Sequence, residues 1–387
     1  MRDPRRRRRQ LVETMLREGV LSDPAWVASF RHVPRHDFVP RFFVPVAGRW
    51  AAIEDGDEDW LAHVYADHVL VTQLDDDPSA WDTARRTGPV QGTPTSSSSM
   101  PSVMAIMLET LLAGDRDRVL EVGTGTGYNA AVLTHRLGAP RVSTVDIDAN
   151  LVRTAKNRLA DGGYHPECAV FDGSAGFPDN APYERVLCTC SVSAIPIAWL
   201  EQTTPGGAIV TTLNRPIGAG LVRVEVGEGT VGHGRVLPRD GRFMPLRAHR
   251  LADARDLLAA IPREAGTPRR TALSIREVLD PTRGFEFFAG LALPEVTPAF
   301  TDPAGSTATD LVHADGSWTR HESRDGEHLV TQGGPRRLWD RLEAAHRQWR
   351  QLGEPDRDRF GLTVTPEYQE FWLDFPDSAH RWPLASP

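Results

Sequence analysis

The chain has 387 residues, of which 40% are hydrophobic and 25% charged, a composition typical of a folded globular protein with room for more than one domain. Its formal net charge of -8 excludes an overall basic field that would attract nucleic acid or an anionic membrane. No apolar stretch reaches the roughly 18 residues that a membrane span needs, and the three cysteines form neither a disulfide framework nor a metal-binding pattern. We therefore expect a cytoplasmic protein without a bound metal, a nucleic-acid partner or a membrane partner.

The first region, residues 1–100, mixes a short helical pattern with Pro-rich and acidic loops. Its arginine run, Arg5–Arg9, predicts a solvated and disordered arm, and docking of an acidic peptide is the less favoured alternative. The serine run Ser96–Ser99 leads directly into an apolar pattern with helical spacing from Val103 to Leu111. We interpret the serines as the approach to a helix rather than as a flexible linker.

The second region, residues 101–245, alternates short β-branched runs with helical patterns. We expect strands at 118–122, 141–146, 168–171, 185–189 and 208–213, and helices at 128–137, 151–159 and 195–203. This alternation predicts a mostly parallel sheet covered by helices on both faces, with ligands bound at the carboxyl ends of the strands.

The third region, residues 246–387, has a different composition and predicts a small α+β accessory domain. Its expected elements are a strand at 285–293, a hairpin turning at Asp315-Gly316, a helix at 338–352 and a strand at 371–373. Three histidines, His313, His321 and His328, fit the polar face of the hairpin better than a metal site.

A glycine-rich segment, Glu121-Val-Gly123-Thr-Gly125-Thr-Gly127, lies where the first core strand gives way to a helix. Glycines there allow a sharp turn and a close approach of the backbone to a ligand. An ordinary tight turn is the alternative interpretation, since many folds share such loops. A dinucleotide fingerprint would require a small residue at Tyr128, and Glu121 would repel a pyrophosphate but attract a cationic sulfonium.

Acidic residues follow the next two strands. Asp146 lies 19 positions after Gly127, where a ribose diol is held in nucleotide-binding folds, whereas the neighbouring Asp148 fits a helix N-cap. Asp172, before Gly173, could accept a hydrogen bond from an adenine amino group or could simply form a turn. Acids at three consecutive strand ends, with no basic residue among them, favour a nucleoside without phosphate, and therefore S-adenosylmethionine over NAD.

With these motifs the sequence resembles the protein-L-isoaspartate O-methyltransferase family over residues from about 10 to 215. The matching blocks are Val33–Pro40 with the family's V-P-R-x-x-F-V-P, Tyr65–Asp67 with Y-x-D, Ser97–Pro101 with T-I-S-Q-P, Val119–Asn129 with its cofactor loop, Ala181–Val186 with A-P-Y-D-R-I, and Ile195–Gly207 with P-x-x-L-x-x-Q-L-x-P-G-G. The blocks are modest individually and specific together.

The resemblance implies an α/β, Rossmann-like class I S-adenosylmethionine methyltransferase with a small α+β C-terminal region. It implies Ser99 as the catalytic serine, with Ser97 and Ser98 as supporting hydrogen-bond donors. Without the resemblance, capping of the following helix would be the preferred role of these serines. The residues implied in cofactor binding are Glu121, Gly123, Thr124, Gly125, Gly127, Asp146, Ile147, Asp172 and Gly173.

The sequence also departs from the family pattern. An acidic insertion that includes Asp75–Asp77 separates the Y-x-D block from the serines, and about 140 residues follow the expected end. These features resemble relatives that act in the maturation of ribosomal peptide natural products, beside ATP-grasp peptide cyclases or lanthipeptide enzymes. That branch implies methylation of an aspartate in a pre-cyclised precursor peptide, leading to an aspartimide. Isoaspartate repair and a non-catalytic peptide-binding scaffold are the alternatives.

Overall fold

The computed structural model describes residues 3–261, 266–299, 308–324 and 326–384. The chain forms two compact units. The first comprises Met1–Cys190, Pro196–Thr211 and Glu225–Thr230, and the second comprises Ser191–Ile195, Thr212–Val224 and Val231–Pro387. Of the ranges expected from the sequence, 1–100 lies in the first unit, 101–245 lies largely in it, and 246–387 lies in the second.

The first unit begins with a helical segment and a small antiparallel sheet in the order β2-β1-β3-β4. The helices of this part are α1 (Pro4–Arg17), α2 (Pro24–His32), α3 (Arg35–Phe38), α4 (Trp60–Val64) and α5 (Ala80–Thr87), and its strands are β1 (Arg41–Val46), β2 (Arg49–Glu54), β3 (Leu70–Leu74) and β4 (Pro94–Ser98). The helix α5 packs on β2 and β3, and the buried side chain of Trp81 anchors it to the sheet.

The disordered arm expected at Arg5–Arg9 is wrong, because these arginines belong to α1. Asp3 caps the helix by accepting a hydrogen bond from the Arg5 backbone N–H at 2.9 Å. The second half of α1 buries Leu11, Val12 and Met15. A capped helix with a buried apolar stripe is stable despite the charges in its first turns, since packing of that stripe supplies most helical stability.

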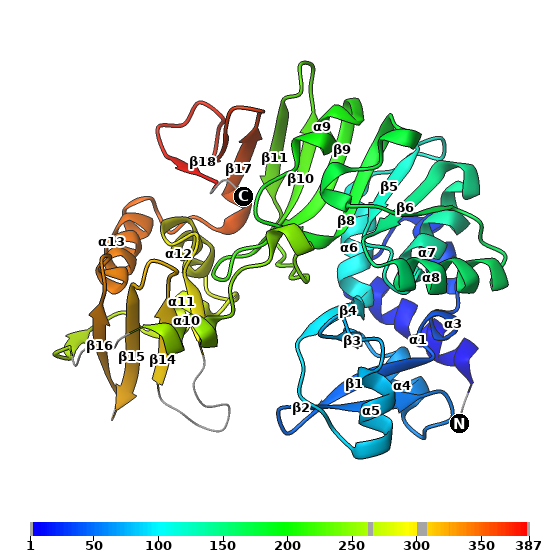
Figure 1. Ribbon diagram of the computed structural model, residues 1–387. Coiled ribbons are helices and arrows are strands. Elements are labelled where there is room, and N and C mark those ends of the chain that lie inside the picture. Colours follow the sequence, from blue (N-terminus) through cyan, green and yellow to red (C-terminus); the bar gives the residue numbers. More distant parts are fainter. Residues whose placement is uncertain (1–2, 262–265, 300–307, 325, 385–387) are drawn as a thin grey trace. The chain divides into compact units, whose positions relative to one another are not determined.

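The parallel sheet expected for the second region is confirmed. In the first unit β5 pairs in parallel with β6 and β8, and β6 pairs in parallel with β7. The strands are β5 (Val119–Val122), β6 (Val142–Asp146), β7 (Glu167–Val170), β8 (Tyr183–Val192) and β9 (Thr203–Leu213), and the helices are α6 (Pro101–Leu111), α7 (Tyr128–Leu137), α8 (Ala149–Asp161) and α9 (Ile197–Glu201). Short 3-10 turns lie at Ala139–Arg141, Gly173–Ala175 and Pro178–Asn180. Figure 1 shows α7 and α8 beside β5 and β6.

The second unit contains the neighbouring strands β19-β18-β17-β11-β10, of which β11, β17, β18 and β19 pair antiparallel, and a separate five-stranded sheet in the order β12-β16-β15-β14-β13. Its strands are β10 (Gly220–Val226, whose last two residues belong to the first unit), β11 (Gly232–Val236), β12 (Arg269–Thr271), β13 (Thr297–Ala299), β14 (Ala308–Val312), β15 (Trp318–Arg324), β16 (Glu327–Gly333), β17 (Phe360–Val364), β18 (Gln369–Leu373) and β19 (Arg381–Pro383). Its helices are α10 (Ala254–Ala260), α11 (Ile275–Leu279), α12 (Phe285–Ala292) and α13 (Leu338–Gln351), with 3-10 turns at Arg247–His249 and Arg357–Arg359.

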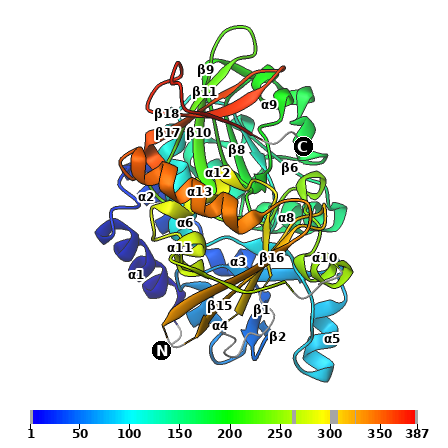
Figure 2. The same ribbon diagram turned by 90° about the vertical axis from the view of Figure 1, so that its left-hand side faces the viewer.

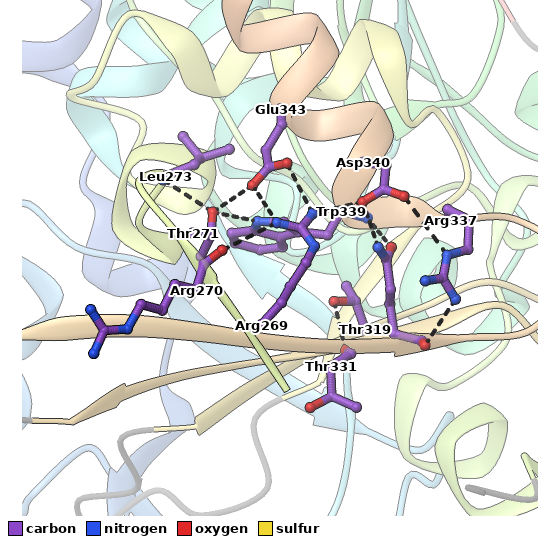
Figure 3. Close-up of polar contacts among 11 residues, drawn as sticks. Arg269, Arg270, Thr271, Leu273, Thr319, Thr331, Arg337, Trp339, Asp340 and Glu343 are labelled. Carbon is purple, nitrogen blue, oxygen red and sulfur yellow. Dashed lines mark hydrogen bonds and ion pairs between the residues drawn. The ribbon is translucent and has the colours of Figure 1, made fainter. Parts of the chain in front are cut away.

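The helix α13 packs against β15 and β16 (Figure 2). A polar cluster joins it to the neighbouring strand β12 (Figure 3): both outer nitrogens of Arg269 donate to Glu343, at 3.0 and 2.9 Å, and one of them also donates to Asp340 at 2.6 Å. The indole N–H of Trp339 donates to Thr271 Oγ1 at 2.9 Å. These bonds, together with the buried apolar face of α13, fix the helix on the sheet.

Two expectations for this unit need correction. The strand expected at 285–293 is the helix α12, in which seven of eight residues are buried. A helix that is apolar on all sides lacks the 3.6-residue period that distinguishes it from a buried strand. The histidines do not form a solvated hairpin face: His321 is 1% exposed and its ring stacks on Trp339, with centroids 5.1 Å apart. The hairpin turn at Asp315-Gly316, the helix near 338–352 and the strand at 371–373 are confirmed.

Candidate functional site

The serine run continues the small antiparallel sheet of the first unit. Ser97 pairs with Val71 and Ser98 with Leu70 across β3 and β4, and α6 begins three residues later at Pro101. The N-cap of α6 is Met100, and no side chain caps the helix. The alternative interpretation of these serines as a helix cap is therefore wrong, and their hydroxyls are left for other roles.

The three predicted serines have different surroundings. Ser98 is 3% exposed, and its hydroxyl accepts a hydrogen bond from Arg35 Nε at 3.3 Å. Ser97 and Ser99 are half-buried, and their hydroxyls form no hydrogen bond with any residue that the structure describes. Their hydroxyl groups are thus chemically available to a ligand, whereas that of Ser98 faces inward.

The glycine-rich loop joins β5 to α7 and lies against the serine strand. Gly123 has φ +102°, and a side chain there would come within 2.7 Å of Thr189 Oγ1. Gly125 has φ +50°, and a Cβ atom at this position would lie 3.5 Å from the carbonyl oxygen of Ser97. The positive φ angles favour glycine at both positions, and at Gly123 the close approach of Thr189 also excludes a side chain. The structure therefore brings the predicted cofactor loop and the predicted serines together.

Glu121 lies beneath this loop and is fully buried. Its Oε1 accepts from Asn129 Nδ2 at 2.7 Å and its Oε2 accepts from Thr144 Oγ1 at 2.6 Å. Burial raises the pKa of this carboxyl group to about 7, against the two hydrogen bonds, which lower it. With both oxygens bonded inside the protein, Glu121 would meet a ligand at the loop through its electric field rather than through direct contact, and a cation there would favour its ionised form.

Asp146 closes β6 at the carboxyl edge of the sheet. Its Oδ2 accepts from the Gly125 N–H at 3.0 Å, and its Oδ1 accepts from the Asp148 N–H at 3.1 Å. Asp148 accepts from the N–H groups of Asn150 and Leu151, so its predicted role as the N-cap of α8 is confirmed. Between the two acids the Ile147 side chain is 43% exposed. A carboxylate such as that of Asp146 suits a ribose, and an exposed apolar side chain such as that of Ile147 suits a flat base.

Asp172 follows β7 and is exposed, while Gly173 is buried. One oxygen of Asp172 accepts from both the N–H and the hydroxyl of Ser174, at 2.9 and 2.8 Å. The turn considered for this segment is therefore present. The second oxygen has no partner among the described residues and remains available.

Sequence reasoning missed several residues that organise the site. Asn129 and Thr144 hold Glu121, and Thr144 Oγ1 also lies 2.7 Å from Thr124 Oγ1. Arg35 binds the serine segment from inside, and Gln73 Nε2 donates to Asp148 Oδ2 at 3.0 Å. Arg35 stands within the Val33–Pro40 block, so an arginine inside a largely apolar segment was the available signal. Nothing in the sequence near Gln73 distinguished it.

The predicted cofactor residues are chemically suited to S-adenosylmethionine. They include no arginine or lysine, so they offer no partner to a pyrophosphate, and they combine acids for the ribose and the cationic end with an exposed apolar residue for the base. No group of three or more His, Cys, Asp or Glu side chains suited to a metal ion occurs among the described residues. Within the same residues, no helix is both long enough and apolar enough to cross a bilayer.

Comparison with known proteins gives a consistent result. Residues 78–238 match the family described as Protein-L-isoaspartate(D-aspartate) O-methyltransferase (PCMT). A protein-L-isoaspartate O-methyltransferase of Azorhizobium caulinodans is 37% identical over 151 residues, which are 39% of this chain and 68% of that protein. One of Methanoculleus marisnigri is 31% identical over 247 residues, 63% of this chain and 93% of that protein. A solved protein-L-isoaspartate O-methyltransferase structure shares the fold, with a TM-score of 0.53, 20% identity, and coverage of 95% of this chain and 100% of the other.

Proposed function

Because the chain belongs to the protein-L-isoaspartate O-methyltransferase family, we propose that it esterifies the side-chain carboxylate of an aspartate in a modified ribosomal precursor peptide. Family membership and fold make it a class I protein carboxyl O-methyltransferase with S-adenosylmethionine as the methyl donor. The proposed product is a methyl ester that can close to an aspartimide, and the proposed site of action is the cytoplasm.

The observation that carries this proposal is the approach of the serine strand to the glycine loop. The Ser97 carbonyl faces Gly125, and the hydroxyls of Ser97 and Ser99 have no described partner. A peptide carboxylate placed there would lie next to the predicted cofactor residues and within reach of two hydroxyl donors. Such donors can hold a carboxylate in one orientation without protonating it. The carboxylate therefore keeps the negative charge that makes it a nucleophile.

The chemistry demands positioning more than proton transfer. An aspartate is ionised at pH 7 and needs no base. S-adenosylmethionine supplies an electrophilic methyl group: an O–CH3 bond forms as the S–CH3 bond breaks, and the electron pair stays on sulfur, giving S-adenosylhomocysteine. The proposed task of Ser99, with Ser97 as a second donor, is to hold the attacking oxygen in line. Ser98, which we expected to be a further donor, is buried and instead supports the segment through its hydrogen bond with Arg35. We propose that Gly125, Asp146, Ile147 and Asp172 hold the nucleoside and that Glu121 favours the positive charge on sulfur.

Two features support a dedicated peptide substrate over general repair. The small sheet β1–β4 contains the acidic insertion next to the serines, and residues 239–387 lie beyond the part whose sequence matches the family model. The second feature counts for less, because the solved isoaspartate methyltransferase structure covers 95% of this chain. The opposing evidence is that the relatives named above are isoaspartate methyltransferases, so repair is the second candidate. The third, a peptide-binding scaffold without catalysis, would require loss of cofactor binding.

The test is incubation of the purified protein with methyl-labelled S-adenosylmethionine and two substrates, a short isoaspartyl peptide and a cyclised precursor peptide that contains aspartate. Label on the cyclised peptide alone is the expected result. Label on the isoaspartyl peptide alone would identify a repair enzyme and refute the precursor proposal. No label together with no binding of S-adenosylmethionine by calorimetry would favour the scaffold.

The variant Ser99→Ala tests the role of the serine. We expect kcat/KM to fall about 10- to 100-fold, because a hydrogen bond to a charged group contributes roughly 1.5–3 kcal/mol. Binding of S-adenosylmethionine should be unchanged. The matched control is Ser79→Ala, since Ser79 lies in the same unit and its hydroxyl bonds only to Asp77 among the described residues. An unchanged rate for Ser99→Ala would remove this serine from the mechanism.

A further inference from the structure

Arg35 is the most completely buried cation of the serine region. Its side chain is 0% exposed, although it carries a guanidinium group at the start of the short helix α3. No carboxylate among the described residues forms an ion pair with it. A buried charge without a counter-ion is costly unless every N–H group is satisfied, so its hydrogen bonds need a full account.

Neutral oxygen atoms accept all of the hydrogen bonds that Arg35 donates. Nε donates to Ser98 Oγ at 3.3 Å, and one outer nitrogen donates to the carbonyls of Val64 and Ala66 at 2.8 and 3.3 Å. The other outer nitrogen donates to the carbonyls of His68, Ser98 and Ser99, at 3.3, 3.3 and 3.0 Å. One guanidinium thus ties the segment 64–68 to the last two serines.

The segment 64–68 is itself bound to the helix that follows the serines. Asp67 Oδ1 accepts from the Ser102 N–H at 2.9 Å, in the first turn of α6. The backbone at Ser99 is therefore held by Arg35 before it enters α6. The start of α6 is in turn bound to Asp67, which belongs to the segment 64–68. The hydroxyl is the part of Ser99 that no described residue binds.

We propose that Arg35 is a positioning residue for methyl transfer, which fixes the Ser98–Ser99 backbone so that the Ser99 hydroxyl meets the substrate carboxylate. The inference rests on the proposed function. Burial lowers the pKa of Arg35 to about 10, so the group stays charged at neutral pH. Arg35 forms no direct ion pair, and the nearby Asp67 carboxylate offsets its charge only in part, so the charge favours an anionic group at Ser99.

The geometry explains why an arginine is needed. A guanidinium is planar and offers five N–H groups in a fixed fork, which here reach acceptors from two chain segments. A lysine has three N–H groups on one nitrogen and can serve only part of this set. A methionine fills a similar volume but leaves the carbonyls without partners.

The test is a double-mutant cycle between Arg35 and Ser99, with the peptide that the wild-type protein methylates. In the wild-type background Arg35→Met should lower kcat about 100-fold, because displacement of a reacting group by about 1 Å can have an effect of that size. Arg35→Lys should lie between Arg35→Met and the wild type. The Kd of S-adenosylmethionine should be unchanged in both variants.

The decisive measurement is the effect of Arg35→Met in the Ser99→Ala background. If Arg35 acts through Ser99, adding Arg35→Met to the Ser99→Ala variant should lower kcat by a much smaller factor than Arg35→Met does in the wild-type protein. An equal loss in the two backgrounds would overturn the proposal, as would a full rate for Arg35→Met. If Arg35→Met does not fold, the same cycle with Arg35→Lys decides.

The matched control is Arg136→Met, which removes another buried arginine of the same unit. Arg136 is bound to Asp23 and to the Ala113 carbonyl, away from the serines. It should lower the melting temperature without changing kcat below that temperature. A loss of kcat like that of Arg35→Met would show that general destabilisation is the cause. By contrast, a Ser99→Ala variant as active as the wild type would contradict the proposed role of Ser99 itself.

Discussion

Two arginines, one in each unit, show opposite ways of using the same side chain. Arg35 in the first unit is fully buried and binds only neutral oxygens, whereas Arg269 in the second is 38% exposed and binds Glu343 and Asp340 (Figure 3). Burial lowers the pKa of Arg35, and the hydrogen bonds with Glu343 raise the pKa of Arg269. Direct ion pairs neutralise the charge of Arg269, whereas Arg35 forms no such pair and is attracted by the Asp67 carboxylate only over a longer distance.

The difference indicates what each region can do. The cluster of Arg269, Glu343 and Asp340 holds β12 and α13 together. Because its opposite charges lie side by side, their fields largely cancel at a distance and attract a ligand only weakly. An uncompensated charge is tolerated only where hydrogen bonds hold it, and its field then favours a ligand of opposite sign. Glu121 is the acidic counterpart of Arg35, since it is also buried and bound to neutral partners. The first unit thus keeps one positive and one negative buried group beside the predicted site.

The largest expected effect is on the pH dependence of stability, and it comes from a buried histidine of the second unit. His321 is buried, and neither ring nitrogen has a hydrogen-bond partner among the described residues. Burial lowers its pKa from 6.5 to about 4. As the pH falls from 6.5 towards 4, the unfolded chain binds a proton that the folded chain does not, so stability is lost. At pH 5 this loss should reach roughly 2 kcal/mol relative to pH 7.

The variant His321→Phe should remove that part of the acid sensitivity and keep the stacking on Trp339. Urea unfolding at pH 7 and pH 5 measures it, as the difference between variant and wild type at each pH. His380→Gln, at an exposed position, is the control and should change neither value. If His321→Phe and the wild type show the same pH dependence, the pKa of His321 is not lowered in the folded protein and the prediction is wrong.

A smaller effect is expected for Glu121 and the cofactor. A cationic ligand prefers the ionised carboxylate, so the affinity for S-adenosylmethionine should rise as the pH passes upward through the pKa of about 7. Between pH 6 and pH 8 we expect an increase of up to about tenfold. S-adenosylhomocysteine lacks the sulfonium charge and should show a weaker dependence. Calorimetric titration of both ligands measures the difference.

The matched variant is Glu121→Gln, which keeps the shape of the side chain and can still bind Asn129. Its affinity for S-adenosylmethionine should be lower at pH 8 and nearly constant between pH 6 and pH 8. A wild-type affinity that is flat with pH, or a variant that retains the full rise, would show that the field of Glu121 does not reach the ligand.

The smallest effect tests the compensated cluster. Arg269→Met should lower the free energy of unfolding of the second unit by roughly 0.5–1 kcal/mol, since the network of three charges that it breaks is partly exposed to solvent. It should leave methyl transfer unchanged at temperatures below unfolding. Arg270→Met is the control, because Arg270 is 78% exposed and forms only a surface pair with Glu327. If Arg269→Met loses activity but not stability, Arg269 contributes to methyl transfer and does not differ from Arg35 in this respect.

Much of the first unit could be predicted because its signals are local. The helix at 128–137, the parallel strands around it and the N-cap at Asp148 follow from periodicity, glycine spacing and capping preference. The arrangement around Arg35 could not be predicted, since all of its acceptors except the Ser98 hydroxyl are backbone carbonyls, which leave no trace in the sequence. The helix α12 was missed because burial of nearly all its residues removes the period. The short helical pattern in α1 was predicted, but the start of this helix was not, because the arginines of its first turns carry no apolar stripe.

Gln73 gives the insertion a consequence that reaches past its own sheet. Its amide N–H group donates to Asp148, next to the acid at the end of β6, while its carbonyl accepts from Thr95 Oγ1 at 3.0 Å, just before the serines. A single amide therefore joins the strand proposed to face the peptide to the corner proposed to hold the nucleoside. The two halves of the site are not independent modules: a graft that exchanges the inserted sheet to change peptide selectivity would also disturb cofactor affinity unless it preserves this amide.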